Sequence, residues 1–339
     1  MDFQWSARRG TIHHRDRSFE TFRAAAPARL AVPPAAVGHL RCAPRDAELR
    51  SFDRPRILRG GGRCARGREA ELVTGDEKAT DGPRADAAHP ARMYDYYLGG
   101  RDNYQADRVA AEAALGAAPE LRAIARENRA FLRRAVRHLA DSGVRQFIDI
   151  GAGLPTRENV HQVAQEIAPE CRVVYVDNDP TVLVHARALL STHPLGRMAV
   201  VQADVRDPER LLADDQVRSL IDFARPLAVL LVSVLQFVPD REPQDVVAPL
   251  RDAMPRGGHL VVSHPTQDFR AGQVGQVAST YHRAKAPAVA RRKAEIERAF
   301  AGFELLEPGI VQTPLWRPDG PVTPDLPLIW MYGAVGRKL

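Results

Sequence analysis

Short apolar runs alternate with amphipathic segments from residue 120 to the end of the chain. The apolar runs are rich in Val, Ile and Leu, which is typical of strands buried on both faces of a parallel sheet. The predicted strands cover residues 147–150, 173–177, 198–204, 227–234 and 260–264. Because strands alternate with helices over this span, the pattern predicts an α/β fold with a doubly wound, mostly parallel sheet.

Helical spacing of apolar residues identifies the segments between these strands. Residues 120–141 form a long amphipathic pattern that ends at Gly143, a common C-terminal stop. A second helix is expected where apolar residues recur at i, i+3, i+4 and i+7, which are Val160, Val163, Ala164 and Ile167. Residues 302–310 and 329–335 are predicted to close the sheet as an antiparallel pair. The charged residues 290–300 are predicted to form a solvent-exposed helix.

The first predicted strand ends in an acid and opens into a glycine turn. This segment reads Asp149-Ile150-Gly151-Ala152-Gly153. Glycine lets the backbone turn tightly against a ligand, and ligand crevices lie at the carboxyl edge of such sheets. A dinucleotide fingerprint would place a third glycine at position 156, where this chain has Thr. The turn therefore favours an adenosyl ligand over NAD or FAD.

Two later strands also end in acids. Asp177 follows Gly153 by 24 residues and is the candidate for binding ribose hydroxyls. Asp204 ends the third strand and is suitably placed to accept a hydrogen bond from an adenine amine. Each acid has an alternative role near a helix start, because Asp179-Pro180 and Asp207-Pro208 both have the pattern of a capped N-terminus. Three strand-terminal acids at one edge nevertheless favour a ligand site.

Together these residues resemble class I S-adenosylmethionine-dependent methyltransferases. The similarity is greatest to one subfamily, called S-adenosyl methyltransferase, that has no settled substrate. Its signature before the glycine turn reads here Arg92-Met93-Tyr94-Asp95-Tyr96-Tyr97-Leu98-Gly99-Gly100, and the resemblance extends over residues 88–338. It implies a Rossmann-like, seven-stranded sheet in the order 3-2-1-4-5-7-6, an N-terminal helical lid and S-adenosylmethionine as cofactor. One departure is Gln236, where the family is expected to have His more often.

The signature contains four of the seven tyrosines of the chain within eleven residues. Tyr94, Tyr97, Arg101 and Tyr104 would share one face of a helix, although Gly99-Gly100 is expected to break it. One interpretation is an aromatic face packed on the sheet. The other is a lid whose Tyr side chains, together with Asn103 and Arg101, close over the ligand and hold its methionine carboxylate.

The predicted cofactor residues lie in this signature, in the glycine turn and after the later strands. They are Tyr94, Tyr97, Arg101, Asn103, Tyr104, Asp149, Gly151, Ala152, Gly153, Asp177, Asn178, Asp204, Val205, Ser233 and Leu235. Gln236 would face the methyl group from the fourth strand, beside the first across the switch point. His264 and His282 are candidates for a general base, although a lone His is more often structural. Residues 265–269 and 281–283 are the candidate acceptor pocket.

Residues 1–85 differ in composition from the rest of the chain. They are rich in Arg, Ala, Gly and Pro, and they hold 17 Lys and Arg against 11 Asp and Glu, so the net charge of +6 lies in this segment. Without sustained apolar spacing it is predicted to be a largely disordered extension. Residues 86–339 are then the methyltransferase domain. The alternatives are an arm that binds nucleic acid and a translation start further downstream.

Several other classes of protein are disfavoured. No apolar run reaches the roughly 18 residues that span a bilayer, so a cytoplasmic protein is expected. Three widely spaced Cys residues give neither a disulfide framework nor a zinc site, and no metal is expected. No Asn-Pro-Pro-Tyr motif follows the fourth strand, which favours a small-molecule acceptor over nucleic acid. A non-catalytic sensor of the cofactor, an NAD(P)-linked oxidoreductase and a nucleic-acid-modifying enzyme remain as alternatives, and the oligomeric state stays open.

Overall fold

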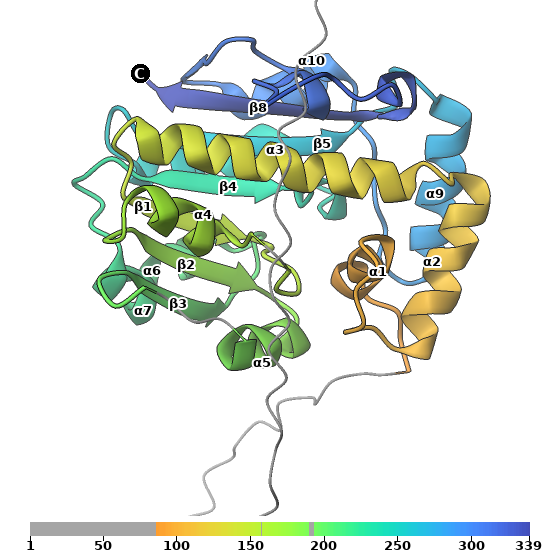
Figure 1. The fold of residues 1–339 in the computed structure, drawn as a ribbon, viewed down its shortest axis with the longest axis horizontal. Coiled ribbons are helices and arrows are strands. Elements are labelled where there is room, and N and C mark those ends of the chain that lie inside the picture. The colour runs from red at the N-terminus through yellow and green to blue at the C-terminus, as the bar shows by residue number, and fades with distance from the viewer. Residues whose placement is uncertain (1–85, 157, 190–192) are drawn as a thin grey trace, which may run out of the picture. The chain divides into compact units, whose positions relative to one another are not determined.

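The computed structural model describes residues 86–156, 158–189 and 193–339. The predicted disordered extension over residues 1–85 lies outside the described residues. Within them, one eight-stranded sheet has the order β3-β2-β1-β4-β5-β8-β6, and β7 pairs with β8 (Figure 1). The strands are β1 Gln146–Ile150, β2 Arg172–Asp177, β3 Arg197–Gln202, β4 Ala228–Val232, β5 His259–Pro265, β6 Phe303–Leu305, β7 Val311–Gln312 and β8 Met331–Lys338.

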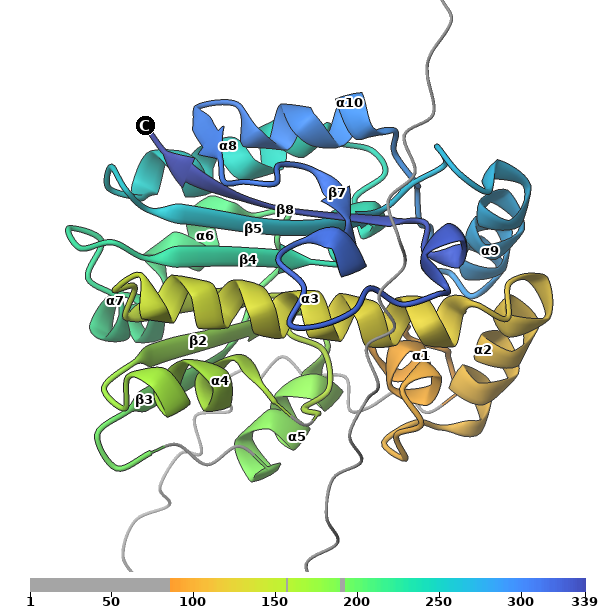
Figure 2. The same cartoon turned by 45° about the horizontal axis from the view of Figure 1, so that its top comes forward.

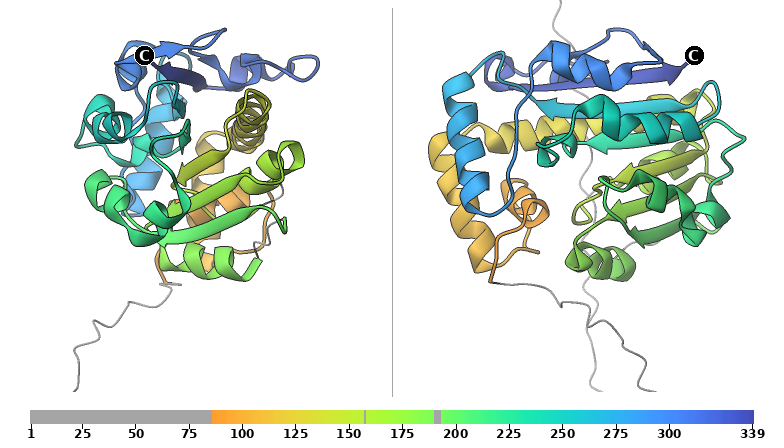
Figure 3. Two further views of the ribbon diagram at one scale, coloured as in Figure 1. Left: turned by 90° about the vertical axis from the view of Figure 1, so that its left-hand side faces the viewer. Right: turned by 180° about the vertical axis from the view of Figure 1, so that it is seen from behind.

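Helices cover both faces of this sheet and its carboxyl edge (Figure 3). The described α-helices are α1 Pro90–Tyr97, α2 Gln105–Ala117, α3 Leu121–Asp141, α4 Val160–Ile167, α5 Pro180–Leu189, α6 Pro208–Ala213, α7 Asp215–Leu220, α8 Pro243–Ala253, α9 Ala271–Arg283 and α10 Lys293–Glu297. The predicted long amphipathic helix is α3, and the predicted helix after the glycine turn is α4. The two predicted helix starts at Pro180 and Pro208 are those of α5 and α6.

Strands β1 to β5 run parallel, and β8 returns antiparallel to β5. Both β6 and β7 pair antiparallel with β8. This arrangement confirms the predicted order, with β8 in the place of the seventh strand. The additional strand β7 was not predicted, because two residues are too short to show the alternation by which a strand is recognised.

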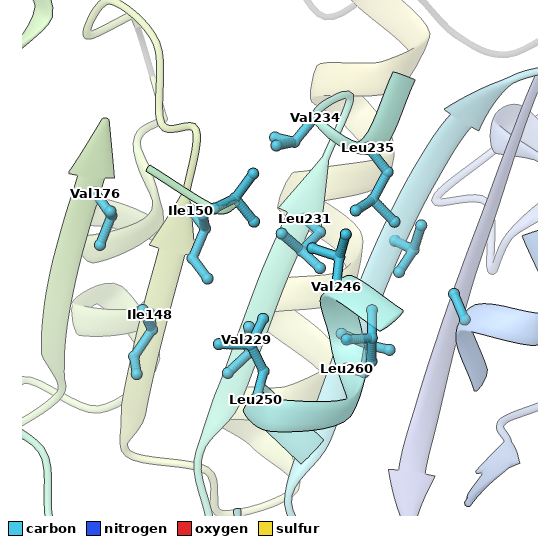
Figure 4. Packing of buried hydrophobic residues seen from close by; sticks show 14 of the residues in the cluster. Ile148, Ile150, Val176, Val229, Leu231, Val234, Leu235, Val246, Leu250 and Leu260 are labelled. Atoms are coloured by element: carbon cyan, nitrogen blue, oxygen red, sulfur yellow. The ribbon is translucent and has the colours of Figure 1, made fainter. Parts of the chain in front are cut away.

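Apolar side chains fill both faces of the sheet. On one face, Ile148, Val229 and Leu231 share a buried cluster with Val246 and Leu250 of α8 (Figure 4). Alternate residues of the same strands point to the other face and pack against α3 and α4, as the period of two in a strand requires. That second cluster includes Phe131, Ala135, Phe147, Val163, Val173, Leu230 and Val261.

A third helical layer stands at the carboxyl edge of the parallel strands. Helices α1, α2 and α9 face the ends of these strands in Figure 1, and α3 extends from the sheet into the same layer in Figure 2. The layer has an apolar cluster of its own, which includes Met93, Tyr97, Leu115, Ile124, Val277 and Trp330. Helices α1 and α2 are the predicted N-terminal helical covering of this edge, and α9 completes it.

Helix α9 was not predicted from the sequence. Its buried apolar positions are Val274, Val277 and Tyr281, spaced by three and four residues, but Gly272 and Gly275 lie among them. Glycine has a low helix propensity, so the local sequence gives only a weak helical pattern. Packing in the apolar cluster of the third layer compensates for it.

The charged segment 290–300 is also different from the prediction. Helix α10 covers only Lys293–Glu297, and a 3-10 turn follows at Arg298–Phe300. Ile296 and Phe300 are 3% and 4% exposed and belong to the cluster under α8. The segment is therefore a half-buried element, because these two apolar side chains tie it to the core.

Candidate functional site

A cavity of about 390 Å³ lies at the carboxyl edge of the sheet. Its polar end is formed by the ends of the first three strands, with Asp149, Gly153, Asp177 and Asp204 in the wall. Its other part, here called the apolar chamber, lies against α3 and α9. The apolar chamber is lined by Leu121, Ile124, Phe237, Val274, Val277, Tyr281, Trp330 and residues 285–290.

Most of the predicted cofactor residues line this one cavity. Those that do are Tyr94, Tyr97, Asp149, Gly151, Ala152, Gly153, Asp177, Asn178, Asp204, Val205 and Ser233. They come from α1 and from the segments that follow the first four strands. The parallel sheet brings these segments together, because the carboxyl ends of parallel strands share one edge.

The glycine turn after β1 leaves its backbone accessible to the cavity. Gly151 and Gly153 have φ angles of 70° and 66°, a region that favours glycine. A Cβ on Gly151 would lie 2.5 Å from Cγ2 of Val234, so a larger residue would clash there. At Gly153 the nearest atom to such a Cβ is the Cβ of Ala91, at 4.0 Å, and a ligand can approach the main chain closely.

Asp177 ends β2, and its carboxylate is held by two backbone N–H groups. The N–H of Gly153 donates to Oδ2 and that of Asp179 donates to Oδ1, both at 2.9 Å. Burial raises the pKa of Asp177 above its usual value, although both hydrogen bonds act in the opposite direction. Each oxygen keeps a further lone pair with which to accept a hydrogen bond from a ligand hydroxyl.

Asp149, near the end of β1, and Asp204, after β3, have opposite electrostatic environments. Burial raises the pKa of Asp149 to about 7, and the charge of Asp177 adds to this shift, whereas Arg129 opposes it. Burial also acts on Asp204, but hydrogen bonds from Arg206 at 2.8 Å and from Asn178 at 3.1 Å hold its pKa below the usual value. A cation bound beside Asp149 would therefore favour its ionised form.

Tyr94 and Tyr97 of α1 line the cavity and are fixed by hydrogen bonds to other elements. The Nδ2 of Asn128 donates to the Tyr94 hydroxyl at 3.0 Å, and Asn128 accepts at Oδ1 from Ser263 Oγ at 2.6 Å. The hydroxyl of Tyr281 donates to that of Tyr97 at 3.3 Å. Burial raises the pKa of Tyr97 strongly and that of Tyr281 to about 12. Both phenols are therefore neutral at physiological pH.

Arg101, Asn103 and Tyr104 were predicted to contact the cofactor but are not among the residues that line the cavity. Helix α1 ends at Tyr97, and Gly99 has a φ of 81°. The chain turns away at this point, so the shared helical face proposed for these residues does not form.

These three residues have other environments. Arg101 is exposed to solvent. Asn103 donates from Nδ2 to the carboxylate of Asp95 at 2.8 Å. The guanidinium of Arg92 lies 5.3 Å from the centre of the Tyr104 ring, in the geometry of a cation–π contact. Their contacts therefore stabilise the loop between α1 and α2.

The turn after β4 places two polar residues, Ser233 and Gln236, in the cavity wall. Ser233 has a φ of 60°, which is unusual for a residue other than glycine. Gln236 is 5% exposed and donates from Nε2 to Ser233 Oγ at 2.7 Å. Its Oε1 is buried and has no hydrogen-bond partner among the described residues. Leu235, also predicted here, is buried in the core and is not in the cavity wall.

Neither predicted general base lies in the cavity wall. His264 is fully buried, and its Nδ1 donates to the carbonyl of Pro265 at 2.7 Å while Nε2 lies 3.0 Å from Nη1 of Arg291. Burial and the adjacent guanidinium lower its pKa to about 3. His282 is exposed near the end of α9. Neither imidazole is therefore placed to take a proton from an acceptor in this cavity. The predicted acceptor segments contribute Pro265 and Tyr281 to the wall.

Sequence reasoning did not single out a buried ion-pair network beneath α1. Arg92 is 2% exposed, and its Nε donates to Asp107 at 2.8 Å while Nη1 donates to Asp179 at 3.1 Å. His89 lies in the cavity wall with its Nδ1 3.1 Å from the same Asp179 carboxylate. The sequence indicated only that Arg92 lies in the tyrosine-rich signature and that Asp179 follows the predicted cofactor residues Asp177 and Asn178.

The described residues contain no group of three or more His, Cys, Asp or Glu placed to hold a metal ion. None of the described helices combines the length and apolar character needed to cross a membrane.

Comparison with known proteins places the chain among methyltransferases. Residues 77–339 match the family model described as S-adenosyl methyltransferase. A DUF574 family protein from Streptomyces avermitilis is 43% identical, with a TM-score of 0.73 over 75% of this chain and 99% of that one. A candidate methyltransferase from Thermobifida fusca is 44% identical, with a TM-score of 0.71 over 77% and 99% of the two chains. No curated protein matches the chain.

Proposed function

The chain belongs to the S-adenosyl methyltransferase family and is an enzyme that uses S-adenosylmethionine; on this premise we propose that the polar end of the cavity binds S-adenosylmethionine and the apolar chamber binds a small-molecule acceptor. The observation that carries the proposal is that one cavity is lined both by the three strand-end acids and by the residues of the apolar chamber. A concave, mostly apolar chamber of this size suits a small molecule better than a nucleic-acid strand.

The polar end fits the chemistry of the cofactor. S-adenosylmethionine presents an ammonium, a sulfonium, ribose hydroxyls and an adenine amine, which are all cations or hydrogen-bond donors. The wall offers the carboxylates of Asp149, Asp177 and Asp204 as complementary acceptors. In this proposal Asp177 binds the ribose, Asp204 and Asn178 lie at the adenine, and Asp149 faces the methionine ammonium. The accessible backbone at Gly153 allows the ligand to lie close to the turn.

When bound, S-adenosylmethionine supplies a methyl group that forms a bond to the acceptor atom while the carbon–sulfur electron pair passes to sulfur and the acceptor proton passes to solvent. The protein's own part is to hold the acceptor in line with that methyl group, since orientation alone lowers such a barrier substantially. His89 is the one histidine among the described residues that lines the cavity, and its imidazole lies against the carboxylate of Asp179. Positioning, rather than proton abstraction by a histidine, is the role that this wall supports.

The proposal is tested by titration calorimetry with S-adenosylmethionine, S-adenosylhomocysteine and NADH. We expect both adenosyl ligands to bind and NADH not to bind. Asp177→Ala should weaken binding about tenfold or more, or about 1.4 kcal/mol, because ribose hydroxyls lose a charged acceptor.

Asp207→Ala is the matched control for this variant. Asp207 is also an acid near the carboxyl edge, but it caps α6 by accepting from the N–H of Arg210 and is not in the cavity wall. Its loss should lower stability by about 1 kcal/mol and leave cofactor affinity unchanged. Unchanged affinity in a folded Asp177→Ala protein would overturn the ribose assignment.

A further inference from the structure

The apolar chamber is walled by side chains that present little charge. Leu121 and Ile124 of α3, Val274 and Val277 of α9 and Trp330 all line it and belong to one apolar cluster. All five residues are at most 7% exposed, so this part of the wall is a packed apolar surface. A surface of this kind gains free energy by burying apolar atoms of a ligand.

Charged groups are unevenly distributed around the cavity. The lining carboxylates are Asp95 of α1, Asp149 and Asp177 at the ends of β1 and β2, and Asp204 after β3. Along the part of the chamber formed by α9 and residues 285–290, the one charged lining residue among those described is Lys285, which is exposed. No carboxylate from these elements is therefore available to pair with a cationic ligand, and Lys285 would repel one.

Gln236 supplies a hydrogen-bonding side chain to the cavity wall. Its Nε2 is already bonded to Ser233, whereas its Oε1 is buried without a partner. A buried polar atom in this state costs free energy unless a ligand satisfies it. The bond from Nε2 to Ser233 also fixes the side chain, and the N–H of Val289 holds the backbone at this point by donating to the main-chain carbonyl of Gln236 at 2.9 Å. The amide oxygen is thus a preformed acceptor for one donor on a ligand.

We propose that the methyl acceptor is an apolar molecule without positive charge, whose single hydroxyl or neutral N–H group donates to Gln236 Oε1. This inference rests on the proposed function, since it assigns a substrate class to the apolar chamber. The apolar part of the molecule is buried against α3 and α9, and Gln236 selects the donor. Gln236 is therefore a specificity-determining residue for the acceptor.

The test measures the binding of three naphthalene derivatives of similar size to the full-length protein saturated with S-adenosylhomocysteine. The probes are 2-naphthol, which has a donor, 2-methoxynaphthalene, which has none, and 2-naphthylmethylamine, which is an ammonium at pH 7.5. Calorimetry should show 2-naphthol binding about tenfold more tightly than either other probe. Equal affinities, tighter binding of the ammonium, or no binding of 2-naphthol would overturn the inference.

Gln236→Met keeps the length of the side chain and removes the amide oxygen. In this variant the preference for 2-naphthol over 2-methoxynaphthalene should disappear, while the affinity for S-adenosylhomocysteine remains. Gln244→Met is the matched control, because Gln244 also has a buried, unpartnered Oε1 but is not in the cavity wall. It should keep the preference, and a preference that survives in Gln236→Met would overturn the role of Gln236.

The two proposals fail separately in this experiment. Failure of S-adenosylhomocysteine to bind in the first titration contradicts the proposed function. Normal binding of S-adenosylhomocysteine together with the wrong order of probes contradicts only the acceptor class. The relative affinities of the three probes are measured on the unmodified protein, so this part of the test does not depend on the folding of a variant.

Discussion

Arg92 of α1 lies 3.1 Å from Asp179, measured from Nη1 to Oδ2, and this ion pair joins the helical layer to the edge of the sheet. Asp179 also donates its backbone N–H to Oδ1 of Asp177, the proposed ribose ligand. On its other side Arg92 pairs with Asp107 of α2, which is fully buried. One guanidinium therefore orders both the start of the helical layer and the turn that follows Asp177 at the end of β2.

Replacement of this arginine should destabilise the fold strongly. Arg92→Met leaves the carboxylates of Asp107 and Asp179 buried without their cation, and breaking such a pair typically costs about 3–5 kcal/mol. We expect the free energy of unfolding, measured with urea, to fall by about that amount. Affinity for S-adenosylhomocysteine should fall as well, because the loop at Asp177 loses its anchor.

Arg133→Met provides the comparison for an exposed ion pair. Arg133 lies 2.7 Å from Asp319, but the two side chains are 31% and 54% exposed. Solvent screens such a pair, so its loss should change the free energy of unfolding by about 0–1 kcal/mol. Similar, small effects of both substitutions would show that the buried network contributes little.

The fold was predictable because its determinants are local. Each central strand is an apolar run of the length of a buried strand, and an acid follows three of these runs. Parallel pairing then fixes the rest, since it places Asp149, Asp177 and Asp204 at one edge without further information. The glycine turn was equally clear, because Gly151 and Gly153 are required by their backbone angles.

The parts that were missed depend on contacts distant in sequence. Arg92 and Asp179 are 87 residues apart, and nothing in either neighbourhood predicts that they pair. His264 has the residue type of a general base, but its environment is set by Arg291, which arrives from a segment 27 residues later. The break at Gly99-Gly100 was expected, but the contact of the Tyr104 ring with Arg92, twelve positions earlier, was not.

The structure changes what is expected of Tyr104. Its ring contacts Arg92 and is not in the cavity wall. Tyr104→Ala should therefore lower the free energy of unfolding by about 1 kcal/mol through the lost cation–π contact, with little change in the dissociation constant of S-adenosylhomocysteine. A tenfold rise in that constant without loss of stability would instead mean that Tyr104 closes over the ligand.

Removal of the N-terminal segment should leave the enzyme domain intact. The family match begins at residue 77, nine residues before the predicted domain start at residue 86. A chain that starts at residue 77 should keep its thermal midpoint within about 2 °C, which corresponds to less than about 1 kcal/mol. Its affinity for S-adenosylhomocysteine should also be unchanged. A large drop in the midpoint would show that the removed residues contribute to the folded domain.

Cofactor affinity should depend on pH through Asp149. Its pKa is about 7 in the ligand-free protein, because the carboxyl is buried. The ammonium of the ligand favours the ionised carboxylate, so the pKa falls on binding and protons are released near neutral pH. Affinity is then full above pH 7 and is lost as the pH falls below it, because protonated Asp149 must first give up its proton. The dissociation constant of S-adenosylhomocysteine should rise about tenfold between pH 8 and pH 6.

Calorimetry in buffers of different ionisation enthalpy measures this linkage directly, since the observed heat changes with the number of protons released. Asp149→Asn should bind more weakly at pH 8 and should lose most of the change between pH 8 and pH 6. Asp177 and His89 also lie in the wall, with pKa values that burial raises and lowers respectively. If the full pH dependence persisted in Asp149→Asn, one of these two groups, and not Asp149, would be the titrating partner of the ligand.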